Sequence, residues 1–307
     1  MLESSRYFEK WLQLKKNRLA PTTWASYRAI MDRHLVPYFG GMELPEITPL
    51  DIEVFLNVLL ETYSPNTVKR IYSVLRASLT KAVRLGLLDS NPAGTERIDP
   101  LPRSKKEIEV FTLDELHQII AALEREPLRW NTFGRVAIDS GARRGELVAL
   151  QWRDVEDNKM VIRRAAYKLP HLTAATKPPK SGQARSVHLT QESAKLLSRL
   201  KREQRKECLR KGVSWSKQSF VFGNHGTMLH PTTPTRWWTR FLERNQLPHR
   251  SLHALRHTSA SLLLSAGVDI KTVSARLGHS SIEVTEIYLH LMQDSDQAAA
   301  QILQNIL

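Results

Sequence analysis

A segment rich in proline, charge and small polar residues lies between positions 90 and 110 and limits how the 307-residue chain can fold. It begins with Ser-Asn-Pro-Ala-Gly and continues through Asp-Pro-Leu-Pro-Arg-Ser-Lys-Lys, a composition typical of a linker between folded units. A chain of this length also exceeds the usual size of one domain. We therefore predict a first domain over residues 1–95, a linker over 96–110 and a second domain over 111–307.

The first domain is predicted to begin with two helices. Phe8, Trp11 and Leu12 lie at helical spacing near the N-terminus. Pro21 then precedes an apolar-periodic run over residues 24–35, which should stop before Pro37 and the following pair of glycines.

Two further helices have clear starting signals. Thr48-Pro49 and Ser64-Pro65 each place a hydroxyl residue before a proline, the pattern of an N-cap followed by proline in the first turn. Gly86 suits the left-handed residue that closes the last helix. We therefore expect a compact bundle of about four helices with aromatic and aliphatic residues in its core.

The second domain is predicted to be mainly helical with a small β-rich insertion. Thr112 should cap a helix over residues 113–123, whereas residues 160–162 and 185–189 have strand character. A Lys-Pro-Pro-Lys-Ser-Gly segment between these strands is typical of a turn. The apolar residues of the last segment, 298–306, share one helix face, which must dock either on its own chain or on a neighbouring subunit.

The charge of the chain favours a polyanionic partner. Lys and Arg number 45 against 31 Asp and Glu, a formal net charge of +14, and residues 111–307 contain 29 of the basic and 18 of the acidic residues. Nucleic acid is the leading candidate. No apolar run approaches the ~20 residues that span a bilayer, and no signal pattern begins the chain, so we expect an intracellular protein. Cys208 is the single cysteine, which excludes a cysteine-based zinc site.

Four short segments of the basic domain contain the candidate chemical residues. They are Ser140-Gly141-Ala142-Arg143-Arg144-Gly145-Glu146-Leu147, Lys180-Ser181-Gly182-Gln183-Ala184-Arg185, His253-Ala254-Leu255-Arg256-His257, and Leu277-Gly278-His279 with Tyr288 nine residues later. Each is weak alone, because an isolated Arg143 or Lys180 is usually a solvated charge and an isolated Tyr288 is usually a core residue. His253 and His257 could share a metal ion, but no third ligand stands at a suitable spacing.

Together these residue types suit attack on a phosphodiester. The negative charge of the phosphate rises in a five-coordinate transition state, so an enzyme without a metal needs fixed cations around the non-bridging oxygens. Arginines provide permanent charge and a planar fork of donors. A tyrosine nucleophile needs a proton acceptor or a strongly cationic pocket, and the leaving oxygen needs a proton donor.

The order and spacing of these residues resemble the tyrosine recombinase or phage integrase family over nearly the whole chain. The second half resembles it most closely, through His253-x-x-Arg256-His257, residues 267–270, the Leu-Gly-His-Ser-Ser run of 277–281, and Thr285-x-x-Tyr288-x-His290. The resemblance implies a helical core-binding bundle followed by a mixed α/β catalytic domain, which form a C-shaped clamp around DNA.

The resemblance also implies a role for each candidate residue. Arg143 and Arg256 would clamp the scissile phosphate, and Lys180 would protonate the leaving 5′ oxygen. His253 would position the phosphate and help to take the proton from Tyr288, and His279 would donate a hydrogen bond to a non-bridging oxygen. Tyr288 would form a 3′-phosphotyrosyl bond, with Glu146 supporting the site without chemistry.

The implied reaction is site-specific recombination of double-stranded DNA without a cofactor or metal. Because the bond energy stays in the phosphotyrosine, rejoining would need neither ATP nor a divalent ion. Two sequential strand exchanges in a homotetramer would pass through a four-way junction. The resemblance also implies accessory DNA-bending proteins as a further class of partner. The recognition site, and the choice among integration, excision and resolution, are not specified by the sequence.

Three points depart from the family pattern or stay open. Lys177 shares the turn with Lys180, and we choose Lys180 because its distance of five residues from Arg185 fits the family. Longer phage integrases often have an N-terminal arm-binding domain, whereas we expect this chain to start directly with the core-binding bundle. The basic run from Lys195 to Lys211 is compatible either with contacts to phosphates or with a solvated helix face.

Three rival functions make different predictions. A DNA-binding regulator without catalysis would give no covalent complex with a nicked substrate. A type IB topoisomerase would relax supercoils without exchanging partners, and a metal-dependent nuclease would lose activity in EDTA.

Overall fold

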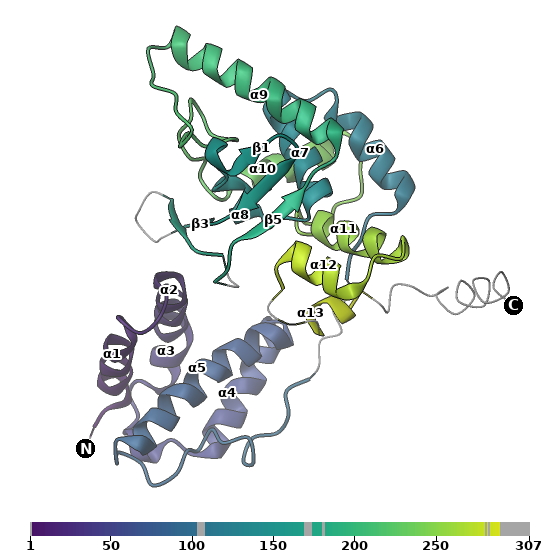
Figure 1. The fold of residues 1–307 in the computed structure, drawn as a ribbon. Coiled ribbons are helices and arrows are strands. Elements are labelled where there is room, and N and C mark those ends of the chain that lie inside the picture. The colour runs from purple at the N-terminus through teal and green to yellow at the C-terminus, as the bar shows by residue number, and fades with distance from the viewer. Residues whose placement is uncertain are drawn as a thin grey trace, which may run out of the picture. The chain divides into compact units, whose positions relative to one another are not determined.

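The computed structural model describes residues 2–102, 108–168, 174–179, 182–279, 281 and 283–288. It divides into two compact units, Met1–Glu107 and Ile108–Leu307 (Figure 1). The fold is mainly α-helical with a small β-rich insertion in the second unit, as the sequence predicts. Within the described part of the chain, no helix combines the length and apolar character needed to cross a membrane.

The first unit is a helical bundle with one apolar core. Its elements are α1 (Ser4–Lys15), α2 (Pro21–Ile30), a π-helical turn (Met31–Leu35), α3 (Val36–Phe39), a 3-10 turn (Leu44–Glu46), α4 (Pro49–Thr62) and α5 (Pro65–Arg84). Phe8, Trp11 and Leu12 on α1 are buried in this core, as predicted. The core also buries Ala93 and Ile98.

Local signals explain most helix ends of this unit. The Thr48 hydroxyl accepts a hydrogen bond from the Asp51 backbone at 3.2 Å, which caps α4 as predicted. Helix α5 begins at Pro65, and Gly86 follows its end with a φ of 69°, the left-handed conformation that glycine adopts without strain.

The prediction that the second helix stops before Pro37 is wrong. The chain stays helical from Pro21 to Phe39, because the π-helical turn Met31–Leu35 joins α2 to α3. Pro37 lies directly after Val36, just past this π-helical turn, where the regular α-helical hydrogen bonding is already interrupted and the missing N–H of proline is tolerated.

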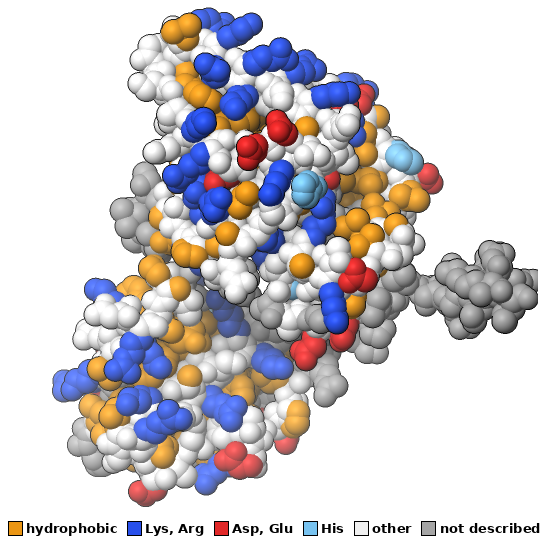
Figure 2. Space-filling model, in the orientation of Figure 1, with side chains coloured by type: hydrophobic (Ala, Val, Ile, Leu, Met, Phe, Trp, Pro, Cys, Tyr) orange, Lys and Arg blue, Asp and Glu red, His pale blue; other side chains and the backbone are white. Residues whose placement is uncertain are grey.

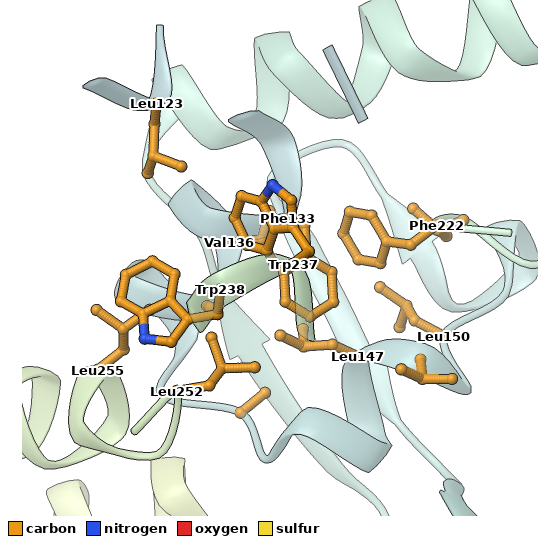
Figure 3. Packing of buried hydrophobic residues seen from close by; sticks show 14 of the residues in the cluster. Leu123, Phe133, Val136, Leu147, Leu150, Phe222, Trp237, Trp238, Leu252 and Leu255 are labelled. Atoms are coloured by element: carbon orange, nitrogen blue, oxygen red, sulfur yellow. The ribbon is translucent and has the colours of Figure 1, made fainter. Parts of the chain in front are cut away.

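The second unit surrounds a larger core. Its helices are α6 (Leu113–Leu123), α7 (Leu128–Ser140), α8 (Arg144–Val148), α9 (Gln191–Arg210), α10 (Thr233–Arg244), α11 (Ala254–Ser265), α12 (Ile270–Leu277) and α13 (Glu283–Glu286), with a 3-10 turn at Trp152–Asp154. Thr112 caps α6 as predicted, through its hydroxyl and the Glu115 backbone. Phe133, Phe222 and Trp237 meet edge to face in the core, with Phe133 5.0 Å from Phe222 and 6.0 Å from Trp237 between ring centroids (Figure 3).

The β-rich insertion consists of two small antiparallel sheets. Strands β1 (Val155–Glu156), β2 (Lys159–Ile162) and β5 (Arg185–His188) form one sheet in the order β1-β2-β5, with Met160 opposite Val187. These include both predicted strands. Strands β3 (Ala165–Tyr167) and β4 (Ala175–Lys177) form a second sheet that the sequence did not predict.

Helix α9 places the basic run of residues 195–211 on the surface. Its apolar face packs on the core through Leu196, Leu197 and Leu200. Lys195, Arg199 and Arg202 are exposed. Lys and Arg side chains gather along α9 in the upper part of the second unit (Figures 1 and 2).

Candidate active site

Arg143 stands at the start of α8, two residues after the left-handed Gly141 that ends α7. Its backbone N–H donates to Glu146 Oε2 at 2.8 Å and its guanidinium donates to Glu146 Oε1 at 3.1 Å. A second guanidinium nitrogen donates to the Gly278 carbonyl at 3.2 Å. The side chain of Arg143 is 27% exposed, so part of its guanidinium remains open to a ligand.

Glu146 links this arginine to the β-sheet. Its carboxylate also accepts two hydrogen bonds from Arg185 on β5, at 3.1 and 2.6 Å, in the two-pronged geometry that guanidinium and carboxylate favour. Burial tends to raise the pKa of Glu146, but hydrogen bonds and charge from Arg185, and then from Arg143, outweigh it and lower the pKa. Glu146 is therefore an ionised, buried carboxylate between two guanidinium groups.

Arg256 on α11 is held by backbone carbonyls instead of a carboxylate. Its two terminal nitrogens donate to the Gly141 carbonyl at 2.7 Å and to the Leu277 carbonyl at 2.9 Å, and the residue is 2% exposed. Burial, and then the charge of Arg143, lower the pKa of Arg256 to about 9, which leaves the guanidinium protonated at neutral pH. Its positive charge lacks a direct ion pair among the described residues.

Gly278 shows how closely these arginines pack. It ends α12 in the left-handed conformation, with a φ of 67°, and its carbonyl accepts from Arg143. A Cβ atom at this position would lie 2.7 Å from an Arg185 nitrogen. Glycine is therefore required here both by the backbone and by the guanidinium of Arg185.

His253 precedes α11 and faces the same cations. Burial, the neighbouring His257 and the charges of Arg256 and Arg143 lower the pKa of His253 to about 4. The imidazole is therefore neutral at physiological pH and can accept a proton.

A pocket of about 360 Å³ opens onto this group of residues. Arg143, His253 and Arg256 line it, together with Arg144, Thr235 and Ser251. The arginines around Glu146 bring three positive charges against one negative charge. The pocket therefore has the charge and the hydrogen-bond donors to hold an anion such as a phosphate.

Tyr288 follows α13 and lies beside this pocket without lining it. The residue is 1% exposed and packs in an apolar cluster with Leu264, Val273 and Leu277. Its hydroxyl forms a 2.6 Å hydrogen bond with Nδ1 of His257. Burial raises the pKa of Tyr288, and the charges of Arg256 and Arg143 offset part of that rise.

His279 lies next to the tyrosine. Its ring stacks with that of Tyr288 at 6.4 Å between centroids, and its Nδ1 forms a 2.7 Å hydrogen bond with the Thr285 hydroxyl. Burial, followed by the charges of Arg256 and Arg143, lowers the pKa of His279 to about 4. At neutral pH this imidazole is uncharged and has one nitrogen available for a ligand.

The structure thus gathers five of the six predicted catalytic residues in one region: Arg143, His253, Arg256, His279 and Tyr288. Lys180 lies outside the described residues. Lys177 is on β4, with its ammonium 5.2 Å from the centre of the Tyr167 ring.

Two further residues at the site received no chemical role from the sequence. His257 contacts the Tyr288 hydroxyl, in place of His253, which we expected to receive its proton. Arg185 pairs with Glu146. The i, i+4 spacing of His253 and His257 is the sequence signal that could have placed His257 at the site. The pairing of Arg185 with Glu146 depends on tertiary structure and has no such signal.

His253 and His257 lie close together, but the described residues offer no third ligand for a metal ion beside them. Their rings meet edge to face at 4.6 Å between centroids. Over the ranges that the structure describes, no group of three His, Cys, Asp or Glu side chains could hold an ion.

Both units match known family models. Residues 109–294 match the model of the phage integrase family, and residues 5–60 match that of the phage integrase N-terminal SAM-like domain. These two matches follow the two compact units.

Sequence relatives extend over both units. The ICEBs1 integrase of Bacillus subtilis is 28% identical over 293 residues, which cover 94% of this chain and 78% of that protein. The XerC-like tyrosine recombinase of Caldanaerobacter subterraneus is 28% identical over 291 residues, covering 87% of this chain and 73% of the relative.

Solved structures share the fold. The Tn1549 transposon integrase, in complex with a circular intermediate DNA, superposes with a TM-score of 0.83 at 18% identity, covering 99% of this chain and 100% of that one. The lambda integrase tetramer bound to a Holliday junction gives a TM-score of 0.72 at 18% identity, with 92% of this chain and 78% of that chain covered.

Proposed function

This chain belongs to the phage integrase family and is a tyrosine-type site-specific recombinase, and we propose that Tyr288 is the nucleophile with which it cleaves DNA. Enzymes of this type cleave and rejoin strands through a 3′-phosphotyrosyl intermediate. The observation that carries the assignment is the surplus of positive charge in the pocket beside Tyr288. Arg143 and Arg256 line this pocket. Among the described residues, the one buried carboxylate beside them, Glu146, pairs with Arg143 and Arg185 and leaves Arg256 without an ion pair.

Arg143 and Arg256 are proposed to clamp the scissile phosphate. Both line the pocket, and Arg256 is fixed by two carbonyls that leave its charge uncompensated. The phosphodiester gains negative charge as the fifth oxygen approaches, so prepositioned guanidinium groups stabilise the transition state more than the ground state. Glu146 keeps Arg143 and Arg185 in place without contacting the substrate.

His253 and His279 are proposed to complete the site as neutral imidazoles. His253 lines the pocket and is neutral in the DNA-free protein, where its pKa is about 4. We propose that the negative charge of the bound phosphate offsets the neighbouring arginines and raises the proton affinity of this imidazole, which then accepts the proton that leaves the phenol. His279 is proposed to donate a hydrogen bond to a non-bridging oxygen, with its other ring nitrogen held by Thr285. Attack by Tyr288 forms the phosphorus–phenol bond and breaks the bond to the 5′ oxygen.

The departing 5′ oxygen needs a proton, and we assign its donor to Lys180. This assignment rests on the five-residue spacing from Arg185, whose guanidinium contacts Glu146 at the pocket. Lys177 is the alternative donor in the same segment. Comparing K180A with K177A on a substrate with a 5′-phosphorothiolate leaving group separates them, because that sulfur departs without a proton and should restore cleavage only to the variant lacking the true acid.

We propose that DNA is held by both units and exchanged in a homotetramer. The net charge of +14 and the SAM-like family match of the first unit support DNA binding on each side of the linker region. Relatives from bacteria and phages suggest that the enzyme acts on DNA in the bacterial cytoplasm. Accessory DNA-bending proteins are a further proposed class of partner.

A nicked suicide substrate tests the nucleophile. Loss of the short fragment beyond the nick prevents rejoining, so the wild-type protein should accumulate a covalent complex that resists boiling in detergent. Y288F should form none, whereas Y38F, a matched change at a half-exposed tyrosine of the first unit, should react normally. A covalent complex in Y288F would remove Tyr288 from the assignment, and supercoil relaxation without exchange between two sites would indicate a topoisomerase.

A further inference from the structure

The Tyr288 hydroxyl points toward a residue that does not line the phosphate pocket. Its hydrogen-bond partner is Nδ1 of His257, at 2.6 Å, and the two rings lie 5.4 Å apart between centroids. His257 follows the pocket residue His253 by one turn of α11, and their rings meet edge to face. His253 therefore faces the pocket, and His257 lies behind it next to the phenol.

His257 provides the polar contact that the buried phenol needs. Ala260, Leu264, Val273 and Leu277 form the apolar cluster around Tyr288. A hydroxyl in such surroundings is costly to bury unless it is hydrogen-bonded. The hydrogen bond to His257 is thus a condition for Tyr288 to stay in this position.

The position itself is unsuited to attack. A nucleophile must come within ~3.5 Å of the phosphorus with its orbital aligned, yet the Tyr288 side chain is almost fully buried and absent from the pocket lining. The element before Tyr288 is the four-residue helix α13, which has few internal hydrogen bonds to resist a rearrangement.

We propose that His257 is a positioning residue that holds the Tyr288 hydroxyl in a stored position behind the phosphate pocket, and that this hydrogen bond breaks before the phenol attacks DNA. The inference rests on Tyr288 being the nucleophile. Release moves the hydroxyl from a neutral apolar cluster toward Arg143 and Arg256, where the developing phenolate is favoured. DNA cleavage therefore includes an exchange of partners at Tyr288, from His257 to the phosphate pocket.

Two variants of similar shape separate the hydrogen bond from packing. In H257N the side-chain amide places an oxygen or nitrogen near the position of Nδ1, so it can replace either the donor or the acceptor role of the imidazole. In H257L a side chain of nearly the same shape has neither. If His257 has a purely structural role, both variants should change the nitration and cleavage rates alike. If it stores the phenol through its hydrogen bond, only H257L should change them.

The first measurement uses the full chain without DNA. Nitration by tetranitromethane reports how often a phenol is accessible, and trypsin releases residues 277–307 as a peptide in which Tyr288 is the one tyrosine. We expect Tyr288 nitration to be about tenfold faster in H257L than in the wild type, the shift that loss of one buried hydrogen bond gives. In H257N, Tyr288 should be nitrated at the wild-type rate. Exposed Tyr38 should be nitrated at the same rate in the wild type and in both variants.

The second measurement is the first turnover on the nicked suicide substrate. Because H257L populates the released phenol more, it should cleave about tenfold faster than the wild type, and H257N should match the wild type. Equal nitration in H257L and H257N overturns the inference. Loss of cleavage in H257L with unchanged nitration also overturns it, because His257 would then act in the chemistry. Cleavage by Y288F would instead refute the proposed nucleophile, while nitration still measures the hydrogen bond.

Y288F provides a second route if H257L does not fold. Removing the hydroxyl deletes the same hydrogen bond from the other side, so backbone hydrogen exchange over residues 283–288 should accelerate about tenfold without DNA. Unchanged exchange in this segment would overturn the inference.

Discussion

Glu146 is the residue whose replacement should disturb the pocket most without touching DNA. In E146Q a neutral amide takes the place of the carboxylate that accepts hydrogen bonds from Arg143 and Arg185. The Glu146 side chain is 1% exposed and that of Arg185 is 9% exposed, so solvent screens this pair little. Three guanidinium groups would remain near one another with no anion between them.

The expected cost follows from breaking one side of a buried ion pair, about 3–5 kcal/mol in unfolding free energy. For a unit of this size it corresponds to a fall of about 10 °C in the melting temperature of the second unit. Chemical unfolding at pH 7 measures this loss of unfolding free energy. E203Q is the matched control, because it removes the same charge from an exposed residue of α9. E203Q should cost less than about 0.5 kcal/mol.

The pH dependence of this loss has a definite sign. The folded protein lowers the pKa of Glu146, so its contribution is complete above the unfolded pKa of ~4.3 and disappears only as pH falls through the lower folded value. The difference between E146Q and the wild type should therefore remain full at about pH 5 and shrink below about pH 4. A loss under 1 kcal/mol at pH 7, or a difference that already vanishes at about pH 5, would refute the reasoning.

Three further predictions concern activity. Excess EDTA should leave cleavage of the suicide substrate unchanged, because arginines supply the positive charge at the phosphate; loss of cleavage would indicate a metal-dependent nuclease. Cleavage at subsaturating DNA, which reports the free enzyme, should stay constant from about pH 7 to about pH 5.5, because the pKa of His253 is about 4; a decline with a midpoint near 6.5 would show an ordinary histidine. Finally, the triple variant K195Q/R199Q/R202Q changes exposed residues of α9 that do not line the phosphate pocket, so first-turnover cleavage of saturating DNA should match the wild type, and slower cleavage would contradict this. The salt dependence of DNA binding in the same variant separates the two interpretations of α9, because a slope reduced by about 2–3 shows contacts with phosphates and an unchanged slope shows a solvated face.

Local rules in the sequence were enough to predict several features of the fold. Thr48 and Thr112 cap helices through backbone groups three residues later, so the signal and its effect lie in the same short segment. The continuation of helix through Pro37 was missed because it depends on a π-helical turn, for which the sequence has no simple pattern.

The candidate site was predictable as a set of residue types and less so as a set of contacts. Arg143, Arg256 and Tyr288 could be chosen because their chemistry suits a phosphodiester and their order resembles a known family. The pairing of Arg185 with Glu146 joins a strand to a helix 39 residues away. The contact between His257 and Tyr288 depends on how the segment after α12 folds back on α11. Such contacts are set by tertiary packing, which residue spacing does not encode.

The position of the covalent bond tests the central claim most directly. After reaction with the suicide substrate, nuclease digestion leaves a short 3′-phosphorylated nucleotide on the protein, and trypsin releases the peptide of residues 277–307, which contains one tyrosine. We predict that fragmentation mass spectrometry places the nucleotide on Tyr288. A nucleotide attached to any other residue, or a cleaved strand with no protein attached, would contradict the account.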